Sequence, residues 1–330
     1  MGGHVSKFTT VVMRMLAISM LLIVAGHTAA QQAYPNRPIR IVVPFPPGGS
    51  IDPLGRFIGQ KLTESWGQQV IVDNRPGGNS IIGTEAVVKS KPDGYTLLLQ
   101  ANSLSINANL LATPYDPITD FAPIATLVSY EYVLVVNPSL PANTLQEFIA
   151  YAKGRPGQLN YASSGTASGI HLGTELFSIA AGVKMQHIPY KGAAPAITDL
   201  IGGQVQLVFQ VPIVVVPLIK SGKLKPLAIS GEARLATLPQ VPTLTEAGLP
   251  GVELRNWNGL LAPAGTPREI VYKLAGEIAK ILAMPDVRAT LLGQGNDPMI
   301  STPDQFAAML KAEVAKFGKI IKAANIKVEN

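Results

Sequence analysis

The 330-residue sequence predicts an α/β protein of two lobes, one of which is inserted into the other. Short β-branched runs alternate with helical patterns from Pro38 onward, which predicts parallel strands joined by crossover helices. A second run of the same kind begins near Val136, and a strand candidate at 254–261 returns the chain to the first lobe. We therefore expect two crossing strands that permit a hinge motion and leave a cleft between the lobes.

The first lobe begins with a strand at 39–43 and a loop of strong breakers at 44–50. A helix with a repeating apolar face then runs to Gly67. Asp52 stands directly before Pro53, which predicts aspartate as the helix N-cap and proline as the first helical residue. The remaining elements expected here are a strand at 70–72, a helix at 80–89 and a strand at 95–99.

The second lobe shows the same alternation. Its expected helices are at 145–153, 170–180, 193–201 and 214–220, and its expected strands at 159–162, 185–188, 205–209 and 226–230.

Two helices are expected to close the chain and to pack on the first lobe. Thr266 and Thr302 each precede a proline, and Glu269 and Gln305 follow three residues after them, which is the pattern of a capping box. We expect residues 31–133 and 256–330 to form lobe 1 and residues 134–255 to form lobe 2.

Composition excludes several classes of protein. With 47% hydrophobic and 15% charged residues, the chain is too apolar to be disordered. It contains no cysteine, which excludes disulfides, thiol nucleophiles, Cys-ligated metals and a lipid-modified cysteine. The densest basic group, from Lys311 to Lys327, has helical spacing, so it predicts a solvated helix face and no nucleic-acid partner.

Residues 1–30 predict a secretory signal peptide. Lys7 and Arg14 precede an apolar run at 15–25, and the segment ends in small residues at Ala29 and Ala30. The alternative is a membrane anchor, but the run is shorter than the roughly 20 residues that a span needs. Cleavage near Ala30 would remove two of 27 basic residues and none of 21 acidic ones, which lowers the net charge from +6 to 25 − 21 = +4. We expect a periplasmic protein.

Three loops of small residues are expected at the carboxyl ends of strands, where open α/β sheets bind ligands. They lie at 47–50, 76–80 and 163–168, and each leads into a helix. Unpaired N–H groups and the helix dipole at such an end suit a carboxylate, sulfate or phosphate. Each loop alone could be an ordinary turn, so the prediction rests on their occurrence in both lobes.

Nucleotide and metal sites are not expected. The sequence has no Walker motif and no G-x-G-x-x-G after a strand. His171 and His187 are the histidines left after signal removal, and no carboxylate cluster accompanies them at ligand spacing. His171 either donates to an anion or hydrogen-bonds within its loop, and His187 is expected to be structural. One enzymatic alternative stays open, a hydrolase that uses Ser163 or Ser164 with His171.

Three other side chains each have two possible roles. Asp52 could accept from a ligand hydroxyl or ammonium group as well as cap a helix. Trp257 could form a wall of the cleft or pack between the lobes. Lys191, which follows Tyr190 before another helix start, is either a ligand contact or solvated surface.

Long motifs in a fixed order resemble the extracytoplasmic receptors of the tripartite tricarboxylate transporter family, the TctC-like or Bug proteins. The resemblance covers essentially the whole mature chain. Its motifs are YPNRPIR (34–40), PFPPGGSID (44–52), VDNRPGGN (72–79), KPDGY (91–95), YASSG (161–165), HIPYKG (187–192), GGQV (202–205) and LAPAGTP (261–267).

The resemblance implies a periplasmic binding protein with a type II-like Venus-flytrap fold, which holds a carboxylate mainly by backbone amides and waters. Gln210, Asn258 and the pair Asn102 and Ser103 depart from the family pattern where the distal end of a ligand is expected. The ligand-binding candidates are Phe45, Gly48, Gly49, Ser50, Asp52, Gly77, Gly78, Asn79, Ser80, Asn102, Ser103, Ser163, Ser164, Thr166, Ser168, His171, Tyr190, Lys191, Gln210 and Trp257.

The predicted function is the capture of a di- or tricarboxylate, an aromatic acid or an acidic amino acid, with no catalysis, cofactor or metal. The expected partners are the membrane permease subunits of a tripartite tricarboxylate-type transporter, and the expected state is a monomer. Besides the hydrolase, a sensory protein that delivers its closed form to a signalling receptor is an alternative.

Overall fold

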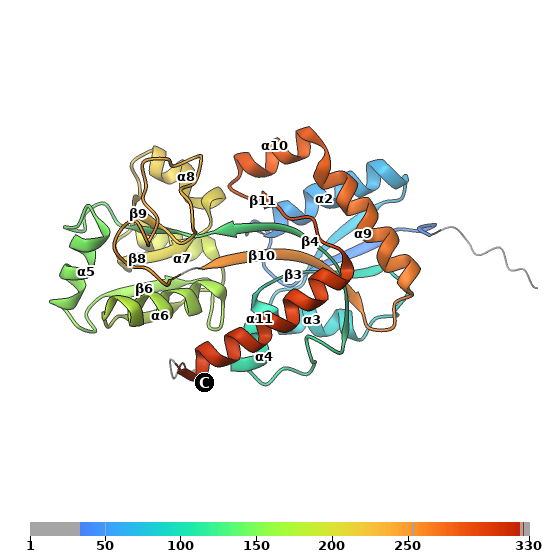
Figure 1. The fold of residues 1–330 in the computed structure, drawn as a ribbon, viewed down its shortest axis with the longest axis horizontal. Helices are drawn as coiled ribbons and strands as arrows, with labels where there is room; N and C mark the ends of the chain where they lie inside the picture. Colours follow the sequence, from blue (N-terminus) through green and yellow to red (C-terminus); the bar gives the residue numbers. More distant parts are fainter. Residues whose placement is uncertain (1–33, 50, 253, 324–325, 327–330) are drawn as a thin grey trace, which may run out of the picture. The chain divides into compact units, whose positions relative to one another are not determined.

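Two β-sheets, one in each lobe, carry the fold (Figure 1). A computed structural model describes residues 34–49, 51–252, 254–323 and 326, and both lobes lie within the compact unit Arg37–Asn330. The predicted signal peptide and the predicted site residue Ser50 lie outside the described residues. Within the described part, no helix combines the length and apolar character needed to cross a membrane.

The sheet of lobe 1 has six strands in the order β11–β4–β10–β3–β1–β2. β1 (Ile39–Val43) lies between β2 (Val70–Asn74) and β3 (Thr96–Ala101) and pairs in parallel with both, as the sequence predicts. The helices that follow these three strands are α2 (Ile51–Trp66), α3 (Ile81–Val88) and α4 (Ser103–Leu110).

The other half of this sheet is antiparallel, which the alternation of strands and helices does not predict. β10 (Arg255–Pro263) pairs antiparallel with β3 and with β4 (Phe121–Glu131), and β11 (Asp297–Pro298) extends the edge beside β4. β4 continues through Tyr132 into β5 (Val133–Val136), which belongs to the other sheet. β4 and β10 therefore run side by side toward lobe 2 and are the two crossing strands (Figure 1).

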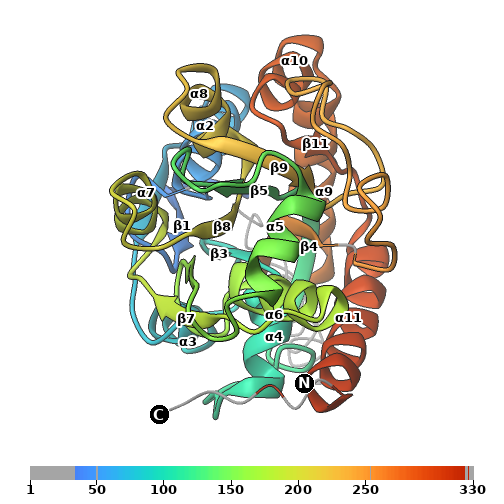
Figure 2. The ribbon, with the colours of Figure 1, turned by 90° about the vertical axis from the view of Figure 1, so that its left-hand side faces the viewer.

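The sheet of lobe 2 has five strands in the order β7–β6–β8–β5–β9, and Figure 2 views it from its outer side. β6 (Asn160–Ser163) pairs in parallel with β7 (Gln186–Pro189) and β8 (Leu207–Gln210), whereas β5 is antiparallel to β8 and β9 (Lys225–Ile229). Its helices are α5 (Leu145–Lys153), α6 (Gly169–Ala181), α7 (Ala193–Ile201) and α8 (Pro212–Lys220).

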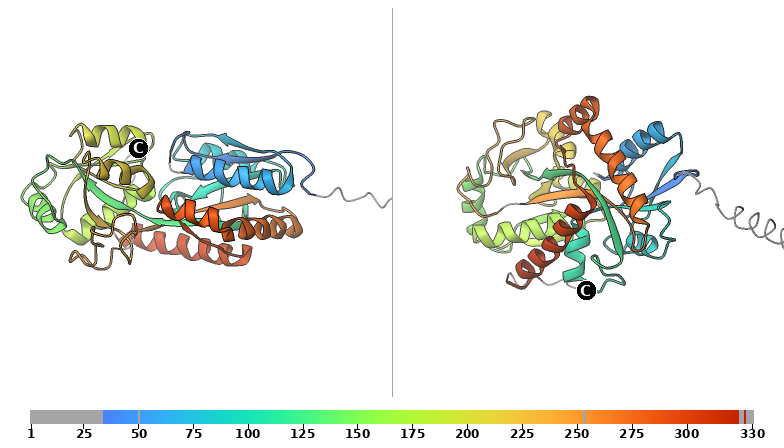
Figure 3. Two further views of the ribbon diagram at one scale, coloured as in Figure 1. Left: turned by 90° about the horizontal axis from the view of Figure 1, so that it is seen from above. Right: turned by 45° about the vertical axis from the view of Figure 1, so that its right-hand side comes forward.

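After β10 the chain stays with lobe 1, and the described part contains three closing helices where two are expected. They are α9 (Arg268–Ala283), α10 (Pro285–Gly293) and α11 (Pro303–Ala323). In the view from above (Figure 3, left), these orange and red helices lie with the blue α2, and the green and yellow elements of lobe 2 lie at the other end.

The two predicted capping boxes have different outcomes. At the start of α11 the box is confirmed, because Gln305 N donates to Thr302 Oγ1 (3.2 Å) and Thr302 N donates to Gln305 Oε1 (2.9 Å). At α9 the prediction is wrong: the helix begins at Arg268, and the buried Thr266 hydroxyl donates to the carbonyl of Pro263 (2.7 Å). That hydroxyl is therefore engaged with the preceding strand end.

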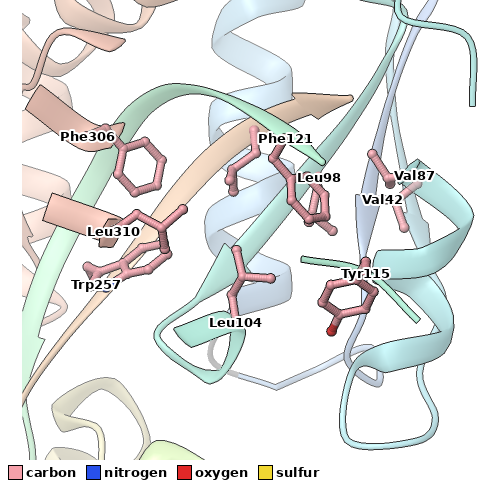
Figure 4. Packing of buried hydrophobic residues seen from close by; sticks show 10 residues of the cluster. Val42, Val87, Leu98, Leu104, Tyr115, Phe121, Trp257, Phe306 and Leu310 are labelled. Atoms are coloured by element: carbon pink, nitrogen blue, oxygen red, sulfur yellow. The ribbon is translucent and has the colours of Figure 1, made fainter. Parts of the chain in front are cut away.

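The core of lobe 1 contains Trp257, which packs edge-to-face on Phe306 of α11 with ring centroids 5.1 Å apart (Figure 4). Gly259 permits this approach, since a methyl group there would lie 2.6 Å from Phe306 Cζ. Trp257 is buried in this cluster, so neither predicted position, the cleft wall or the space between the lobes, describes it.

Candidate functional site

Two adjoining pockets lie where the lobes meet. The hinge pocket has a volume of about 150 Å³ and reaches the crossing strands at Tyr130, Tyr132 and Asn256. The loop pocket, about 600 Å³, is lined by the glycine- and serine-rich loops of both lobes. The pockets share lining residues from both lobes, namely Phe45, Pro46, Ser103, Ser164, Ser168, Lys191 and Gly192.

Most of the predicted site residues line one pocket or both. Those in the hinge pocket are Phe45, Gly48, Gly49, Asn102, Ser103, Ser164, Ser168, Lys191 and Gln210. Those in the loop pocket are Phe45, Gly77, Gly78, Asn79, Ser80, Ser103, Ser164, Thr166, Ser168, Tyr190 and Lys191. The described candidates that line neither pocket are Asp52, Ser163, His171 and Trp257.

The loop before α3 has an unusual backbone. Four consecutive residues have positive φ, from Gly77 (125°) and Gly78 (54°) to Asn79 (54°) and Ser80 (75°). This conformation costs free energy for asparagine and serine. It persists only where the surroundings enforce it, and it is concentrated at ligand sites. Successive amides in such a turn form a concavity that suits an anion.

Two buried amide side chains enforce this conformation, and the sequence analysis did not identify either. Asn107 Nδ2 donates to the carbonyl of Asn79 (2.7 Å) and to Ser80 Oγ (3.4 Å). Gln100 Nε2 donates to Thr84 Oγ1 (2.9 Å) and Ser80 Oγ (3.3 Å). The sequence carries a signal only for Gln100, which follows three leucines in the segment that becomes β3, because α4 contains several other polar residues besides Asn107.

Asp52 holds the loop after β1 and is not the N-cap of α2, which already begins at Ile51. Its Oδ2 accepts from Gly48 N (3.1 Å) and Arg56 Nε (3.2 Å). Burial alone would raise the pKa of Asp52, but the bonds from Gly48, Arg56 and Asn74 outweigh it and lower the pKa. The carboxylate is thus occupied within lobe 1, and the Gly48 amide is occupied with it.

The loop after β6 is held by its own side chains and by a histidine. Gly165 N donates to Ser163 Oγ (3.2 Å), and Ala167 N donates to His171 Nδ1 (3.2 Å) with Ala167 at φ 60°. Ser168 Oγ accepts from His171 N and caps α6. These bonds leave Ser164 and Thr166 as loop residues facing the loop pocket.

The two histidines stack behind this loop. His171 is buried and lines neither pocket, and its bond to the Ala167 amide confirms the expected alternative of a hydrogen bond within its loop. The His171 and His187 rings lie 4.0 Å apart, and Tyr161 stacks on His187 at 5.0 Å. Burial lowers the pKa of His171 to about 4, and burial together with His171 lowers the pKa of His187 to about 3. Both rings are neutral at neutral pH.

For Ser163, the pairing with His171 that a hydrolase would need is wrong. Ser163 Oγ lies 2.7 Å from Nε2 of His187, and the Ser163 side chain is 0% exposed. His171 instead accepts from the Ala167 amide. A serine without access to the cleft cannot attack a substrate held there.

The hinge pocket contains polar residues that the sequence analysis did not select. Asn256 Nδ2 donates to the hydroxyls of Tyr130 (2.8 Å) and Tyr132 (2.6 Å). Burial raises the pKa of both phenols well above the ordinary value, so they remain protonated. Among the described residues that line the two pockets, Lys191 is the charged one, and it is exposed.

The two sheets, the crossing strands and the cleft residues drawn from both lobes define a solute-binding protein with a type II-like Venus-flytrap fold. The model of the tripartite tricarboxylate transporter family receptors matches residues 54–326. The chain belongs to this family.

Relatives and solved structures agree with this assignment. The chain is 37% identical to the protein BugT of Bordetella pertussis, over 96% of this chain and 99% of BugT. The structure of Rpa4515 from R. palustris with adipate is similar with a TM-score of 0.86 at 36% identity, covering 89% of this chain and 99% of that one. The periplasmic binding protein BugD has a TM-score of 0.84 at 33% identity, covering 90% and 100%.

Proposed function

We propose that this receptor captures a small carboxylate between its lobes in the periplasm and presents the closed form to the permease subunits of a tripartite tricarboxylate-type transporter. The observation that carries the proposal is the left-handed loop from Gly77 to Ser80, held by Asn107 and Gln100 beside the loop of the second lobe. The adipate in the Rpa4515 structure supports a carboxylate ligand.

Backbone amides supply the attraction in this proposal. The lining residues of the loop pocket are neutral apart from the exposed Lys191, so an anion there would be stabilised by N–H groups and by the starts of α3 and α6. The proposed site residues are those candidates that line the two pockets, together with Ser50.

The two loops approach each other closely enough to share one ligand. A methyl group on Gly165 would lie 3.3 Å from Asn79 Oδ1, and one on Gly192 would lie 3.9 Å from Pro46 Cγ. A ligand that contacts both lobes stabilises the closed arrangement by the difference between its affinities for the closed and open forms.

The proposal includes export and a monomeric state. Cleavage near Ala30 would release a mature chain in which residues 31–133 and 256–330 form lobe 1 and residues 134–255 form lobe 2. We propose no catalytic step. Delivery of the closed form to a signalling receptor would use the same ligand site.

A thermal-shift panel of di- and tricarboxylates, aromatic acids and acidic amino acids tests the proposed function. The protein is first unfolded, dialysed and refolded, because this treatment removes any endogenous ligand. We expect at least one acid to raise the melting temperature, because a ligand that binds only the folded state stabilises it. A broad panel without a stabiliser contradicts the proposal.

A further inference from the structure

We propose that closure of the lobes is coupled to the uptake of one proton from solvent by Glu313, and that reopening releases this proton. Glu313 lies on α11 and lines a cavity of about 50 Å³, here called the α11 cavity. It lines neither the hinge pocket nor the loop pocket. The inference rests on the proposed function, since it takes ligand binding to favour the closed arrangement.

Both lobes form the α11 cavity. The apolar side chains that line it are those of Ile106 of α4, Phe317 and Ile320 of α11, Leu172 and Leu176 of α6, and Leu254. All but Leu254 belong to one apolar cluster, which also contains Ala167 of the second-lobe loop. Figure 2 shows α4, α6 and α11 next to one another. Helix α6 of lobe 2 therefore covers the space beside Glu313 of lobe 1.

One side of α6 lines both this cavity and the hinge pocket. Gly169, Leu172, Gly173 and Leu176 follow one another at helical spacing, so they lie on one side of the helix, and all four line the α11 cavity. Gly169 also lines the hinge pocket, where a methyl group on it would lie 2.8 Å from Asn102 Oδ1. A hinge motion that draws Gly169 away from Asn102 therefore also draws the leucines away from α11 and admits water.

The hydrogen-bond donors to Glu313 do not move with α6. Glu313 Oε2 accepts from Trp257 Nε1 (2.7 Å) and from Ser105 Oγ (2.8 Å). Because both donors belong to lobe 1, as Glu313 does, opening removes the apolar cover and keeps the donors. In the described arrangement, burial raises the pKa of Glu313 to about 7, so hydration on opening should return the pKa to its ordinary value of 4.5 or lower.

The other charged and titratable residues that line the cavity do not change their protonation between pH 6 and pH 8. They are Lys316 of α11, Arg255 of β10 and Tyr132 between β4 and β5. Lys316 lowers the pKa of Glu313 and moves with it on the same helix. Burial raises the pKa of Tyr132 well above the ordinary value, so the phenol stays neutral. The lining residues from α4 and α6 carry no charge.

The sign and size of the coupling follow from the two pKa values. A pKa that is higher in the closed form favours closure, and this advantage is fully present below about pH 4.5 and is lost as the pH rises through about 7. The affinity for a carboxylate should therefore fall about 10-fold between pH 6 and pH 8. His171 and His187 stay neutral over this range, because burial lowers their pKa values to about 4 and about 3.

Calorimetry on ligand-free mature protein at pH 6, 7 and 8 tests the inference. Succinate, adipate, citrate, benzoate and glutamate are screened first, and the acid that binds most tightly is used throughout. The parent should bind this acid about 10-fold more weakly at pH 8 than at pH 6, and buffers of different ionisation enthalpy should show uptake of roughly 0.7 proton at pH 6.5. Glu313→Gln keeps an acceptor for both donors, so it should lose both effects and bind more tightly than the parent at pH 8. Comparing parent and variant cancels the titration of the acid itself.

A second variant removes part of the apolar cover. Leu176→Ala on α6 admits water to the cavity in the closed form, so the pH dependence of affinity should fall below about 3-fold. Ile179→Ala on the same helix and Glu64→Gln on α2 are the matched controls, because both residues are exposed and line none of the three cavities. Both control variants should keep the pH dependence of the parent.

The possible outcomes separate the inference from the proposed function. Equal pH dependence in the parent and in Glu313→Gln, or a parent that takes up no proton on binding, overturns the inference and leaves carboxylate capture intact. Absence of binding by every acid contradicts both. Circular dichroism shows whether Glu313→Gln folds; if it does not, an undiminished pH dependence in Leu176→Ala overturns the inference.

Discussion

The loops 77–80 and 163–168 have similar compositions, but different chemistry holds them in place. In lobe 1 the loop is fixed by amide side chains, with Asn107 donating to Asn79 and Ser80. In lobe 2 the bond from Ala167 N to the ring of His171 fixes the loop. Because an amide side chain does not titrate and burial lowers the pKa of His171 to about 4, the first loop should be insensitive to pH and the second should weaken in acid. Two loops of similar Gly- and Ser-rich composition can therefore differ in their sensitivity to pH, because residues outside the loops hold them.

The largest expected effect comes from removing the support of the first loop. Asn107→Leu deletes the donor to Asn79 and Ser80, so the left-handed backbone should relax and ligand affinity should fall by about 10- to 100-fold. Calorimetry with the best acid measures the loss. Asn109→Ala, an exposed position on the same helix, is the control. Unchanged affinity in the folded Asn107 variant would mean that the loop conformation does not matter for binding.

A methyl group at the start of α6 should interfere with the second lobe's approach. In Gly169→Ala the new carbon would lie 2.8 Å from both Asn102 Oδ1 and Tyr132 Oη, so the lobes should close less tightly and affinity should fall by roughly 10-fold. Gly276→Ala in α9 meets open space and should bind normally. Similar affinities for the two variants would show that the described approach of the lobes is not the liganded one.

Acid should weaken the second loop selectively. Burial depresses the pKa of His171 to about 4 and of His187 to about 3, below the ordinary value of 6.5, so folding disfavours their protonation. Their contribution to stability is present above pH 6.5 and is lost as the pH falls through about 4. His171→Asn, whose Oδ1 can replace Nδ1 as acceptor, should reduce the fall in melting temperature between pH 6.5 and 4. An unchanged slope contradicts this assignment.

Glu313 of α11 should have the smallest effect, and its contribution to stability should depend on pH in the opposite direction to that of the histidines. Burial raises its pKa to about 7 despite donors from Trp257 and Ser105, so its contribution to stability is present below pH 4.5 and is lost as the pH rises through about 7. Glu313→Gln keeps an acceptor for both donors and should be more stable than the parent at pH 8, by about 1–2 kcal/mol. Denaturant unfolding at pH 5 and pH 8 measures the difference in the free energy of unfolding between variant and parent. A larger increase at pH 5 than at pH 8 would contradict the prediction.

The sequence predicts local structure where one segment decides it. Helices 145–153 and 193–201 have the bounds expected, because their apolar faces and flanking residues define them. The antiparallel pairing of β10 with β3 and β4 depends on residues more than a hundred positions apart, so periodicity does not predict it. Trp257 was misplaced for the same reason, since Phe306 of α11 determines its surroundings.

The part of the candidate site that glycine- and serine-rich loops form can be predicted from the sequence. The glycine- and serine-rich loops indicate where amides can approach a ligand, and most of their residues line the two pockets. The supporting residues Gln100 and Asn107 and the hinge residues Tyr130, Tyr132 and Asn256 belong to no loop motif. Their roles arise from hydrogen bonds between distant segments, such as that from Asn256 on β10 to Tyr130 on β4.

A crystal structure of the protein with its tightest-binding acid tests the central claim most directly. We predict a carboxylate of the ligand within hydrogen-bonding distance of backbone amides in the loops 77–80 and 163–168. A ligand held by Lys191 or other cationic side chains, with no amide of either loop in contact with a carboxylate, would contradict it.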